Sequence, residues 1–384
     1  MRVLHVYRTY FPDTQGGLEE VIRQICRNTL DLGIESRVFM LSSNPVPPIL
    51  KREEAEVHRF QLTFEVASCG VSISALTGFK HLVDWADIVH YHFPWPFADL
   101  LHILGRVHKP TLVTYHSDIV RQKSLLRLYR PLMRAFLNQV DVIVPTSQNY
   151  FATSEELGRY AEKVEVIPIG LNRQTYPEVS EKALSLTRER VGKGFFLFIG
   201  VLRYYKGLHI LLEAIQNTSL KCVIVGSGPT SCELREQADR LGLSNVQFLG
   251  QVSDIEKIHL IYLSKAMVFP SHLRSEAFGV TLVEGAMFGK PLISTEIGTG
   301  TSYINMDGKT GFVVPPSNTK ALRGAMLKLE QKNQLVISMG QAAKERYEAL
   351  FTGSLMGKRY FNLYGRLMLN KSLSGKHKSK STSD

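Results

Sequence analysis

The 384-residue sequence contains little of what marks secreted, membrane-spanning or metal-dependent proteins. Its four cysteines are scattered without a Cys-x-x-Cys pair, which predicts reduced thiols in a cytosolic protein and excludes disulfides or cysteine metal sites. No apolar run approaches the roughly 18 residues of a membrane span. The N-terminal segment has no cleavage site, so we expect a first strand there and no signal peptide. The sequence also lacks an Asp-x-Asp metal-binding motif, so we expect no metal ion. We expect no other cofactor.

The net charge of +11 is unevenly distributed along the chain. Residues 1–170 hold 18 basic and 18 acidic residues, residues 171–370 hold 24 and 16, and the tail 371–384 holds four and one. A basic excess indicates an anionic partner, and here it lies in the second half of the chain. A nucleic acid would be such a partner, but no helix-turn-helix, zinc or RNP-type pattern accompanies the charge. We therefore expect no nucleic-acid partner.

Strand-like and helical segments alternate throughout, which predicts parallel sheets covered by helices on both faces. The first series comprises strands Arg2–Tyr7, Arg37–Leu41, Ile88–His92, Thr111–Tyr115, Val142–Pro145 and Val164–Pro168, with a helix over Leu18–Leu32. The second comprises strands Phe195–Ile199, Lys221–Val225, Val246–Leu249 and Pro291–Ser294, with helices Gly207–Gln216 and Ser231–Leu241.

This rhythm predicts two α/β domains, 1–170 and 190–353. The stretch between them, from Ile169 to Glu189, is polar and irregular, so we place a linker at 171–189. Residues 354–370 have the pattern of a final amphipathic helix. The tail 371–384 is rich in Ser and Lys and is expected to be disordered.

Two glutamates with seven residues between them, Glu276 and Glu284, are the most informative feature of the chain. A short apolar strand precedes Glu276, and helical spacing begins after Gly279, so Glu276 lies in a strand-to-helix turn. Such a turn directs free N–H groups and the positive end of the helix dipole at an anion. Carboxylates on either side suit a ligand that has both phosphates and sugar hydroxyls, such as a nucleotide-sugar. The alternative is a structural loop with two solvated glutamates.

The string Ser-Glu-Ala-Phe-Gly-Val-Thr-Leu-Val-Glu-Gly around this pair resembles the motif of glycosyltransferase family 4 (GT4), and the resemblance extends from a Gly-Gly loop near the N-terminus to about residue 350. The family contains retaining enzymes of the GT-B fold, so the resemblance implies two Rossmann-like α/β domains facing a cleft. It also implies roles at the motif. Glu284 would hold the ribose, and Glu276 would hold the sugar and diphosphate together with the backbone of Phe278, Gly279 and Val280.

Lys206 and Arg203 stand three residues apart where a helix follows the strand 195–199. Both can point into a crevice at the carboxyl end of the strand, where two cations would stabilise a departing diphosphate. The alternative is an ordinary charged surface. The family usually has Gly-Arg-Leu-x-x-x-Lys-Gly, and this chain has Val201 in place of the arginine. Lys206 therefore matches the motif, whereas Arg203 is a displaced substitute.

Two glycine-rich turns predict close approach to phosphates. Gly16 and Gly17 separate the first strand from a long helix, and the resemblance implies that this loop closes over the donor. Gly226 begins a Gly-Ser-Gly-Pro turn like the one beneath the nucleotide in the family. A dinucleotide fingerprint is the alternative, but residue 231 is Ser and no acidic residue follows at the next strand end.

His116 closes the predicted strand 111–115, and the resemblance implies that it contacts the donor sugar. Packing or capping is the alternative for a histidine at a strand end. His90 and His92 alternate along another strand, and Pro94 and Pro96 follow them. We interpret this segment as a shaped loop on the acceptor side, and we do not expect these histidines to bind a metal.

The segment 123–137 predicts a helix with one basic face. At roughly 100° per residue its basic residues fall within an arc of about 60°. This arrangement favours docking on an anionic bilayer, and the alternative is a core helix with a solvated basic face that Pro131 interrupts. The basic face comprises Lys123, Arg127, Arg130 and Arg134, and the apolar side comprises Leu125, Leu128, Tyr129, Leu132, Met133 and Phe136.

The opening segment, Met-Arg-Val-Leu-His-Val-Tyr-Arg-Thr-Tyr-Phe-Pro-Asp-Thr-Gln-Gly-Gly, and the segment Val-Leu-Arg-Tyr-Tyr-Lys-Gly-Leu look most similar to bacterial O-polysaccharide mannosyl- and D-rhamnosyltransferases. That resemblance implies a GDP-sugar donor, a polyprenyl-diphosphate-linked saccharide acceptor, and a cytoplasmic enzyme bound peripherally to the inner face of the inner membrane. A UDP-hexose donor, a nucleotide-sugar 2-epimerase of the same fold, and a catalytically silent binding protein are the alternatives.

Overall fold

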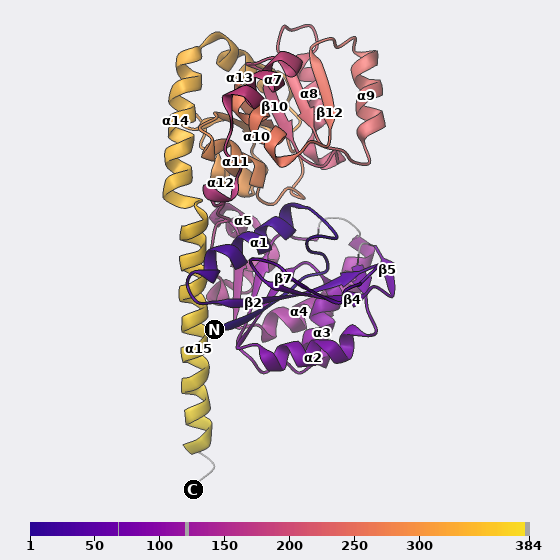
Figure 1. Ribbon diagram of the computed structural model, residues 1–384, viewed down its shortest axis with the longest axis vertical. Helices are drawn as coiled ribbons and strands as arrows, with labels where there is room; N and C mark the ends of the chain where they lie inside the picture. Colours follow the sequence, from indigo (N-terminus) through magenta and orange to yellow (C-terminus); the bar gives the residue numbers. More distant parts are fainter. Residues whose placement is uncertain (68, 120–122, 381–384) are drawn as a thin grey trace. The chain divides into compact units, whose positions relative to one another are not determined.

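The computed structural model describes residues 1–67, 69–119 and 123–380, which form two compact α/β units. Unit 1 comprises residues 1–146, 154–170 and the C-terminal segment from Gly353 onward. Unit 2 comprises residues 147–153 and 171–352. Each unit contains one large parallel sheet with helices packed against it (Figure 1).

The sheet of unit 1 has the order β3-β4-β2-β1-β7-β8-β9, and all its pairs are parallel except β3 with β4. Every residue of β7 is buried, as expected for a central strand covered on both faces. The strands are β1 (Arg2–Val6), β2 (Glu35–Ser42), β3 (Ile49–Lys51), β4 (Glu56–Gln61), β7 (Ile88–Phe93), β8 (Thr111–Tyr115) and β9 (Val142–Pro145). The principal helices are α1 (Gly17–Leu30), α2 (Ala75–Trp85), α3 (Pro96–Leu104), α4 (Lys123–Gln139) and α15 (Gly353–Lys380).

The sheet of unit 2 has the order β12-β11-β10-β13-β14-β15 and is parallel throughout. Its strands are β10 (Phe196–Ile199), β11 (Cys222–Val225), β12 (Val246–Gly250), β13 (Ala266–Phe269), β14 (Leu292–Thr295) and β15 (Gly311–Val314). Its helices include α7 (Glu181–Val191), α8 (Leu208–Ile215), α9 (Ser231–Arg240), α10 (Asp254–Leu263), α11 (Val280–Met287), α13 (Thr319–Gln331) and α14 (Asn333–Leu350).

The strand order reverses once in each unit, between β1 and β7 in unit 1 and between β10 and β13 in unit 2. In a doubly wound sheet the connections on the two sides of such a point cover opposite faces. A crevice therefore opens beyond the carboxyl ends of the two central strands, and ligands bind there. We therefore expect ligand-binding residues in the loops that follow β1, β7, β10 and β13.

The structure differs from the expected secondary structure in three segments. Residues 164–168 donate two backbone hydrogen bonds along β9, but only Val164 forms a bridge, because Pro145 has no N–H to return the next one. Part of the expected irregular linker is helix α7, which Ser180 caps by accepting a hydrogen bond from the Ala183 N–H at 3.3 Å. Helix α15 continues to Lys380, through much of the tail that was expected to be disordered.

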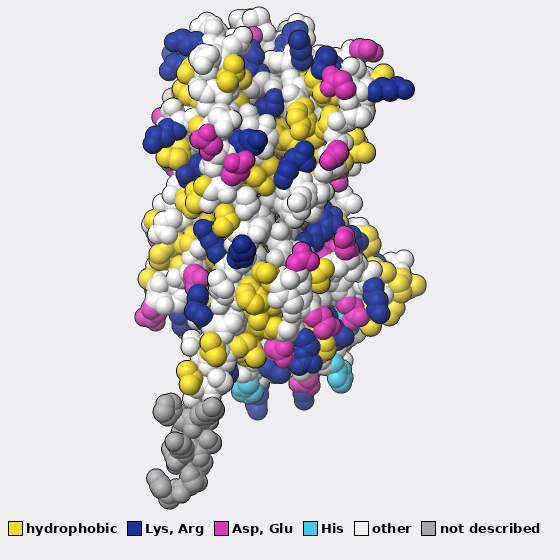
Figure 2. All heavy atoms as spheres, turned by 60° about the vertical axis from the view of Figure 1, so that its left-hand side comes forward, with side chains coloured by type: hydrophobic (Ala, Val, Ile, Leu, Met, Phe, Trp, Pro, Cys, Tyr) yellow, Lys and Arg dark blue, Asp and Glu magenta, His cyan; other side chains and the backbone are white. Residues whose placement is uncertain are grey.

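Among the described residues, no helix combines the length and the apolar character needed to cross a bilayer. The cysteines are free, as expected. On the face drawn in Figure 2, Lys and Arg side chains are interspersed with Asp and Glu and do not gather into one patch.

Candidate functional site

The crevice position of unit 2 brings Lys206 and Glu276 together. Lys206 lies in a short 3-10 helix after β10, and Glu276 lies in the loop after β13. Their side chains form an ion pair, and they are only 12% and 10% exposed. The Ser271 hydroxyl donates to the same carboxylate at 3.4 Å, and the Lys206 Nζ lies 4.5 Å from the centre of the Phe269 ring. Two residues that are distant in sequence thus form one partly buried charged pair where the strand order reverses.

The turn at Gly226 packs directly beneath the loop that leads to Lys206. Gly226 has φ 126°, and a Cβ atom there would collide with the carbonyl group of Gly200. The Leu202 N–H donates to the Ser227 carbonyl at 3.0 Å and joins the two loops. The glycine at 226 is therefore required by loop packing, whether or not a phosphate also approaches it.

Helix α11 begins at Val280, directly after Gly279, as the motif predicted. Gly279 has φ 96°, a conformation that favours glycine, and it turns the chain from the Glu276 loop into the helix. The Phe278 side chain is buried in the core. The Thr281 hydroxyl donates to the Ile199 carbonyl at 3.3 Å and attaches the start of α11 to the end of β10.

Glu284 is held by two side chains that the sequence motif did not reveal. Its Oε1 accepts from the Tyr176 hydroxyl at 2.9 Å and from the Lys257 Nζ at 2.8 Å. Because both donors meet one oxygen, Oε2 is the oxygen that can accept from a ligand hydroxyl. Tyr176 is 108 residues from Glu284 and Lys257 is 27 away, so no local spacing could have identified them.

Arg203 is exposed, and its backbone is extended where it precedes the 3-10 helix of Lys206. Its carbonyl accepts from the Lys206 N–H at 2.9 Å, which sets the turn that carries the lysine. Val201, in the place of the family's arginine, is also exposed. The role of Arg203 as a substitute cation stays a prediction.

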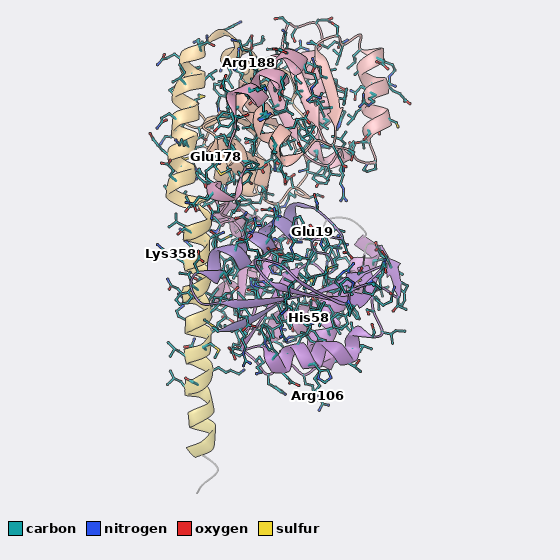
Figure 3. All side chains as sticks on the ribbon, viewed as in Figure 1. Glu19, His58, Arg106, Glu178, Arg188 and Lys358 are labelled. Atoms are coloured by element: carbon teal, nitrogen blue, oxygen red, sulfur yellow. The ribbon has the colours of Figure 1, made fainter. Side chains whose placement is uncertain are left out.

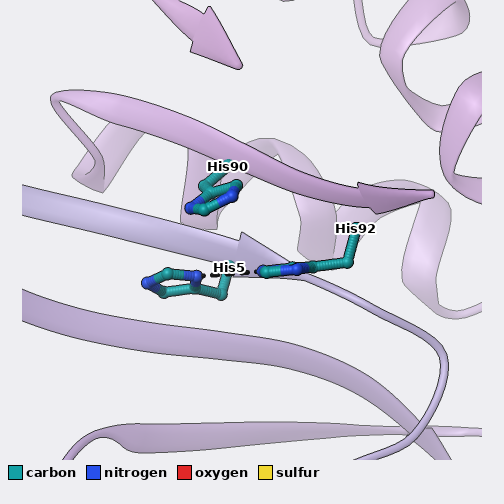
Figure 4. Close-up of side chains that lie close together, drawn as sticks. All are labelled: His5, His90 and His92. Carbon is teal, nitrogen blue, oxygen red and sulfur yellow. Dashed lines mark hydrogen bonds between the residues drawn. The ribbon is translucent and has the colours of Figure 1, made fainter. Parts of the chain in front are cut away.

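In unit 1, His116 follows β8 directly and is buried. Its Nε2 lies 3.1 Å from the Nδ1 of His92. The Nε2 of His92 lies 3.2 Å from the Nδ1 of His5 (Figure 4). Sequence reasoning selected His116 and noted His92, but it missed His5. The missed signal was the parallel pairing of β1 with β7, which aligns His5 with His90 and brings β1 beside the two histidines of β7.

The group His5, His90 and His92 has nitrogen atoms within 4.8 Å of one another, a spacing that could hold a metal ion. Both nitrogens of His90 are already hydrogen-bonded, to the Tyr364 hydroxyl at 2.8 Å and the Thr114 hydroxyl at 2.7 Å. The His90 ring also stacks on His92 with centroids 4.4 Å apart. A metal would have to displace one of these two short hydrogen bonds, so the trio fits a hydrogen-bonded packing cluster better than a metal site.

The Gly16–Gly17 loop also lies in unit 1, after β1. A Cβ atom at Gly16 would lie 2.6 Å from Oε2 of Glu19, which is labelled on α1 in Figure 3. Glu19 also accepts from the Thr14 hydroxyl at 3.0 Å. A carboxylate thus folds back over the start of α1, and a phosphate bound there would have to displace it. No atom of the described residues lies within 4 Å of a Cβ at Gly17, so their packing does not require a glycine at that position.

The basic face expected on α4 is only partly free. Arg127 and Arg130 are exposed, whereas Arg134 forms an ion pair with Glu156 at 3.1 Å. The side chain of Lys123 lies outside the described residues. Of the three basic side chains that the structure describes on this face, Arg127 and Arg130 are therefore available to an anionic surface.

The apolar side of α4, for which a place in the core was the alternative to lipid contact, is buried only in part. Met133 and Phe136 are buried, but Leu128 is 80% exposed and Leu125 is also exposed. The reason is that the buried contacts of α4 come from its second half, while its first half leaves leucines beside the exposed arginines. This mixture of apolar and basic side chains is typical of a surface that meets lipid.

Two family models match the chain in succession. "Glycosyltransferase Family 4" matches residues 15–175, and "Glycosyl transferases group 1" matches residues 181–346. Among solved structures, sucrose-phosphate synthase from Thermosynechococcus elongatus is similar with a TM-score of 0.80. The match covers 96% of this chain and 99% of that one at 19% identity, which identifies the GT-B fold alone.

Two curated relatives are much closer in sequence. D-rhamnosyltransferase WbpZ of Pseudomonas aeruginosa is 55% identical over 92% of this chain and 92% of its own length. O-antigen chain mannosyltransferase C of Escherichia coli is 48% identical over 97% of this chain and 100% of its own length.

The buried histidines of unit 1 predict a loss of stability in acid. Burial lowers the pKa of His5 and of His116 to about 3, and lowers the pKa of His90 and His92 well below the usual 6.5. Below pH 6.5 the unfolded chain takes up protons that the native state does not, so stability falls as the pH decreases from about 6.5 toward 3. Melting temperatures measured from pH 8 to 5 should be level above 6.5 and fall below it.

In the variant His5→Phe, the free energy of unfolding should depend less steeply on pH below 6.5. The slope should decrease by up to about 1.4 kcal/mol per pH unit, which is the contribution of one proton. An unchanged slope would show that His5 titrates normally in the native state.

Proposed function

Since this chain belongs to glycosyltransferase family 4 and is a hexosyltransferase, we propose that it transfers mannose or D-rhamnose from a GDP-sugar, with retention of configuration, to a lipid-linked saccharide. The product would be part of a bacterial O-antigen polysaccharide.

The observation that carries this proposal is the near full-length similarity to two transferases, one named for D-rhamnose and one for mannose. Both relatives exceed 45% identity, and the matched regions include the complete motif from Glu276 to Glu284. The choice of a GDP-sugar and of a lipid-linked acceptor comes from this resemblance and is the part that needs testing.

The charged pair of unit 2 suits the departure of a nucleoside diphosphate. Lys206 is a partly buried cation, and in such surroundings a cation stabilises developing negative charge more strongly than in water. Glu276, held by Lys206 and Ser271, would accept from sugar hydroxyls, and Oε2 of Glu284 would accept from the ribose. The acceptor hydroxyl would attack on the face from which the diphosphate departs, so the protein need not supply a nucleophile.

A panel of donors and acceptors tests the proposal. The purified protein is incubated with GDP-mannose, GDP-D-rhamnose, UDP-glucose and UDP-GlcNAc, with and without a polyprenyl-diphosphate-linked saccharide, and products are resolved by mass spectrometry and NMR. We expect an α-linked product from a GDP-sugar only when the lipid acceptor is present, and activity that largely survives EDTA.

Each other outcome of the panel identifies an alternative. Transfer from a UDP-sugar would contradict the GDP assignment, conversion of a donor without acceptor would indicate an epimerase, and binding without turnover would indicate a silent protein. A β-linked product would exclude retention.

The ion pair predicts a further result. Lys206→Ala and Glu276→Ala should each lower turnover by roughly 100-fold or more, because the lysine stabilises the departing diphosphate and the glutamate positions the sugar. Each single variant also leaves a partly buried unpaired charge, so the double variant should melt no lower than the less stable single variant.

Lys257→Met is the matched comparison for these variants. Lys257 meets only the Glu284 end of the motif, so its loss should raise the KM for the donor roughly 10-fold and change kcat less. If a folded Lys206→Ala protein kept near wild-type turnover, the proposed role of Lys206 in the reaction would be wrong.

We also propose that the first half of α4 docks unit 1 on an anionic bilayer through Arg127, Arg130, Leu125 and Leu128. Each basic residue near such a surface contributes about 1 kcal/mol. The variant Arg127→Gln/Arg130→Gln should therefore bind vesicles containing anionic lipid roughly 30-fold more weakly, and wild-type binding should weaken as salt increases. Vesicle co-sedimentation measures both.

A second basic and apolar surface of unit 1 provides the control. A hollow of about 810 Å³ beside α2 and α3 is lined by Leu76, Leu104, Lys80 and Lys109, among others. The variant Lys80→Gln/Lys109→Gln removes the same charge from this hollow and should leave vesicle binding unchanged. Equal loss in both variants would show that net charge alone, and not α4, attracts the protein to the vesicles.

A further inference from the structure

Three histidines on neighbouring strands of unit 1 form a continuous hydrogen-bonded line. His5 on β1 contacts His92 on β7, and His92 contacts His116 after β8, with nitrogen distances of 3.2 and 3.1 Å. The rings are stacked, with centroids 5.5 and 5.4 Å apart. Each ring nitrogen of His92 therefore contacts another imidazole, so His92 connects His5 with His116. Figure 4 shows the His5–His92 half of this connection.

The chemistry of a neutral imidazole restricts how this line can be protonated. One ring nitrogen carries a hydrogen and the other carries a lone pair. If the N–H of His92 points to His116, its other nitrogen must accept from His5, and if it points to His5, it must accept from His116. The two hydrogen bonds therefore run in the same direction along the line, and that direction sets the tautomer of His116.

The buried end of the line favours one direction. His5 is fully buried, and its Nε2 has no hydrogen-bond partner among the residues that the structure describes. If the hydrogen bonds ran inward, this nitrogen would carry a buried N–H without an acceptor, and such orphan N–H groups are rarer in proteins than unsatisfied acceptors. If they run outward, the Nδ1–H of His5 donates to His92, the Nδ1–H of His92 donates to His116, and only a lone pair is left unsatisfied.

We propose that His5 and His92 are positioning residues that fix His116 in the Nδ1–H tautomer, so that His116 offers its ligand a hydrogen-bond donor. In the outward direction Nε2 of His116 accepts from His92, and its single N–H is on Nδ1. The identity of the acceptor, an oxygen of the donor sugar, rests on the proposed function. The tautomer itself does not. Burial lowers the pKa values of all three rings, which keeps them neutral and the line intact near pH 7.

A second buried network lies beside the line without joining it by a hydrogen bond. His90 bonds the Tyr364 and Thr114 hydroxyls, and the Thr114 hydroxyl lies 2.9 Å from that of Tyr360. Tyr360 and Tyr364 come from α15, so this network attaches the C-terminal helix to the sheet. The residues of this network are as buried as the three histidines of the line, but they do not contact His116. Substitutions in the network therefore serve as controls for substitutions of His92.

The tautomer can be measured directly in the full-length protein. Long-range ¹H–¹⁵N NMR spectra of protein labelled with ¹⁵N-histidine distinguish Nδ1–H from Nε2–H rings, and the variant His116→Gln assigns the signals of His116. We expect the Nδ1–H pattern for His116 in the wild type at pH 7.5, without any substrate. A single Nε2–H pattern would overturn the proposal, and so would a stoichiometric metal ion bound to these histidines.

Variants of His92 then test the connection. His92→Phe removes both nitrogens, and His116 should become a mixture of tautomers while turnover falls roughly 10-fold or more. His92→Gln keeps one donor and one acceptor, and it should recover part of the turnover and of the tautomer preference. In Tyr364→Phe both readouts should remain at wild-type values.

If His92→Phe does not fold, the wild-type spectrum and His92→Gln still decide the question. An unchanged tautomer in a folded His92→Phe protein overturns the proposal. Failure of every donor in the panel would refute the proposed function, while the spectra would still report on the tautomer.

Discussion

The structure depends on one topological constraint, the reversal of strand order in the middle of each parallel sheet. Parallel strands need crossover connections of a single hand, so a reversal places successive helices on opposite faces and leaves the carboxyl ends of two central strands uncovered. In unit 2 those ends belong to β10 and β13, and the chain has placed Lys206 after one and Glu276 after the other. Each of these charges would be costly to leave partly buried alone, so the pair holds the two loops together.

The loops at this edge are shaped by contacts between backbones as much as by side chains. The Gly226 turn can lie beneath the Gly200–Leu202 loop only because no Cβ intervenes, and Gly279 turns the chain into α11 at a positive φ. Thr281 then joins α11 to the end of β10. The motif residues are therefore presented by a preorganised edge, which is the arrangement that catalysis by positioned charges requires.

Unit 1 has the same topology, but histidine side chains fill its interior beside the point where the strand order reverses. Buried polar groups must find partners, and the tyrosine hydroxyls of α15 supply them for His90 and Thr114. His5, His92 and His116 contact one another instead, and of the described polar atoms in this line the Nε2 of His5 is left without a partner. A core of this kind is stable only while its rings are neutral, so the same residues that organise the strand ends also link the stability of the unit to pH.

The sequence alone determined the α/β class, most of the strands, and the strand–turn–helix context of Glu276 and Glu284, because hydrophobic periodicity and turn residues act locally. It also selected Lys206 and His116, each at the end of a predicted strand. It failed for residues 164–168, where Pro145 in another strand has no N–H to continue the pairing beyond Val164. It left open whether the apolar side of α4 is core, because the burial of Leu125 and Leu128 depends on what α4 packs against. Only the tertiary structure decided that Lys206 pairs with Glu276, that Tyr176 and Lys257 hold Glu284, and that His5 completes the line behind His116. These contacts join distant segments through the order of strands in a sheet, and local spacing carries no information about that order.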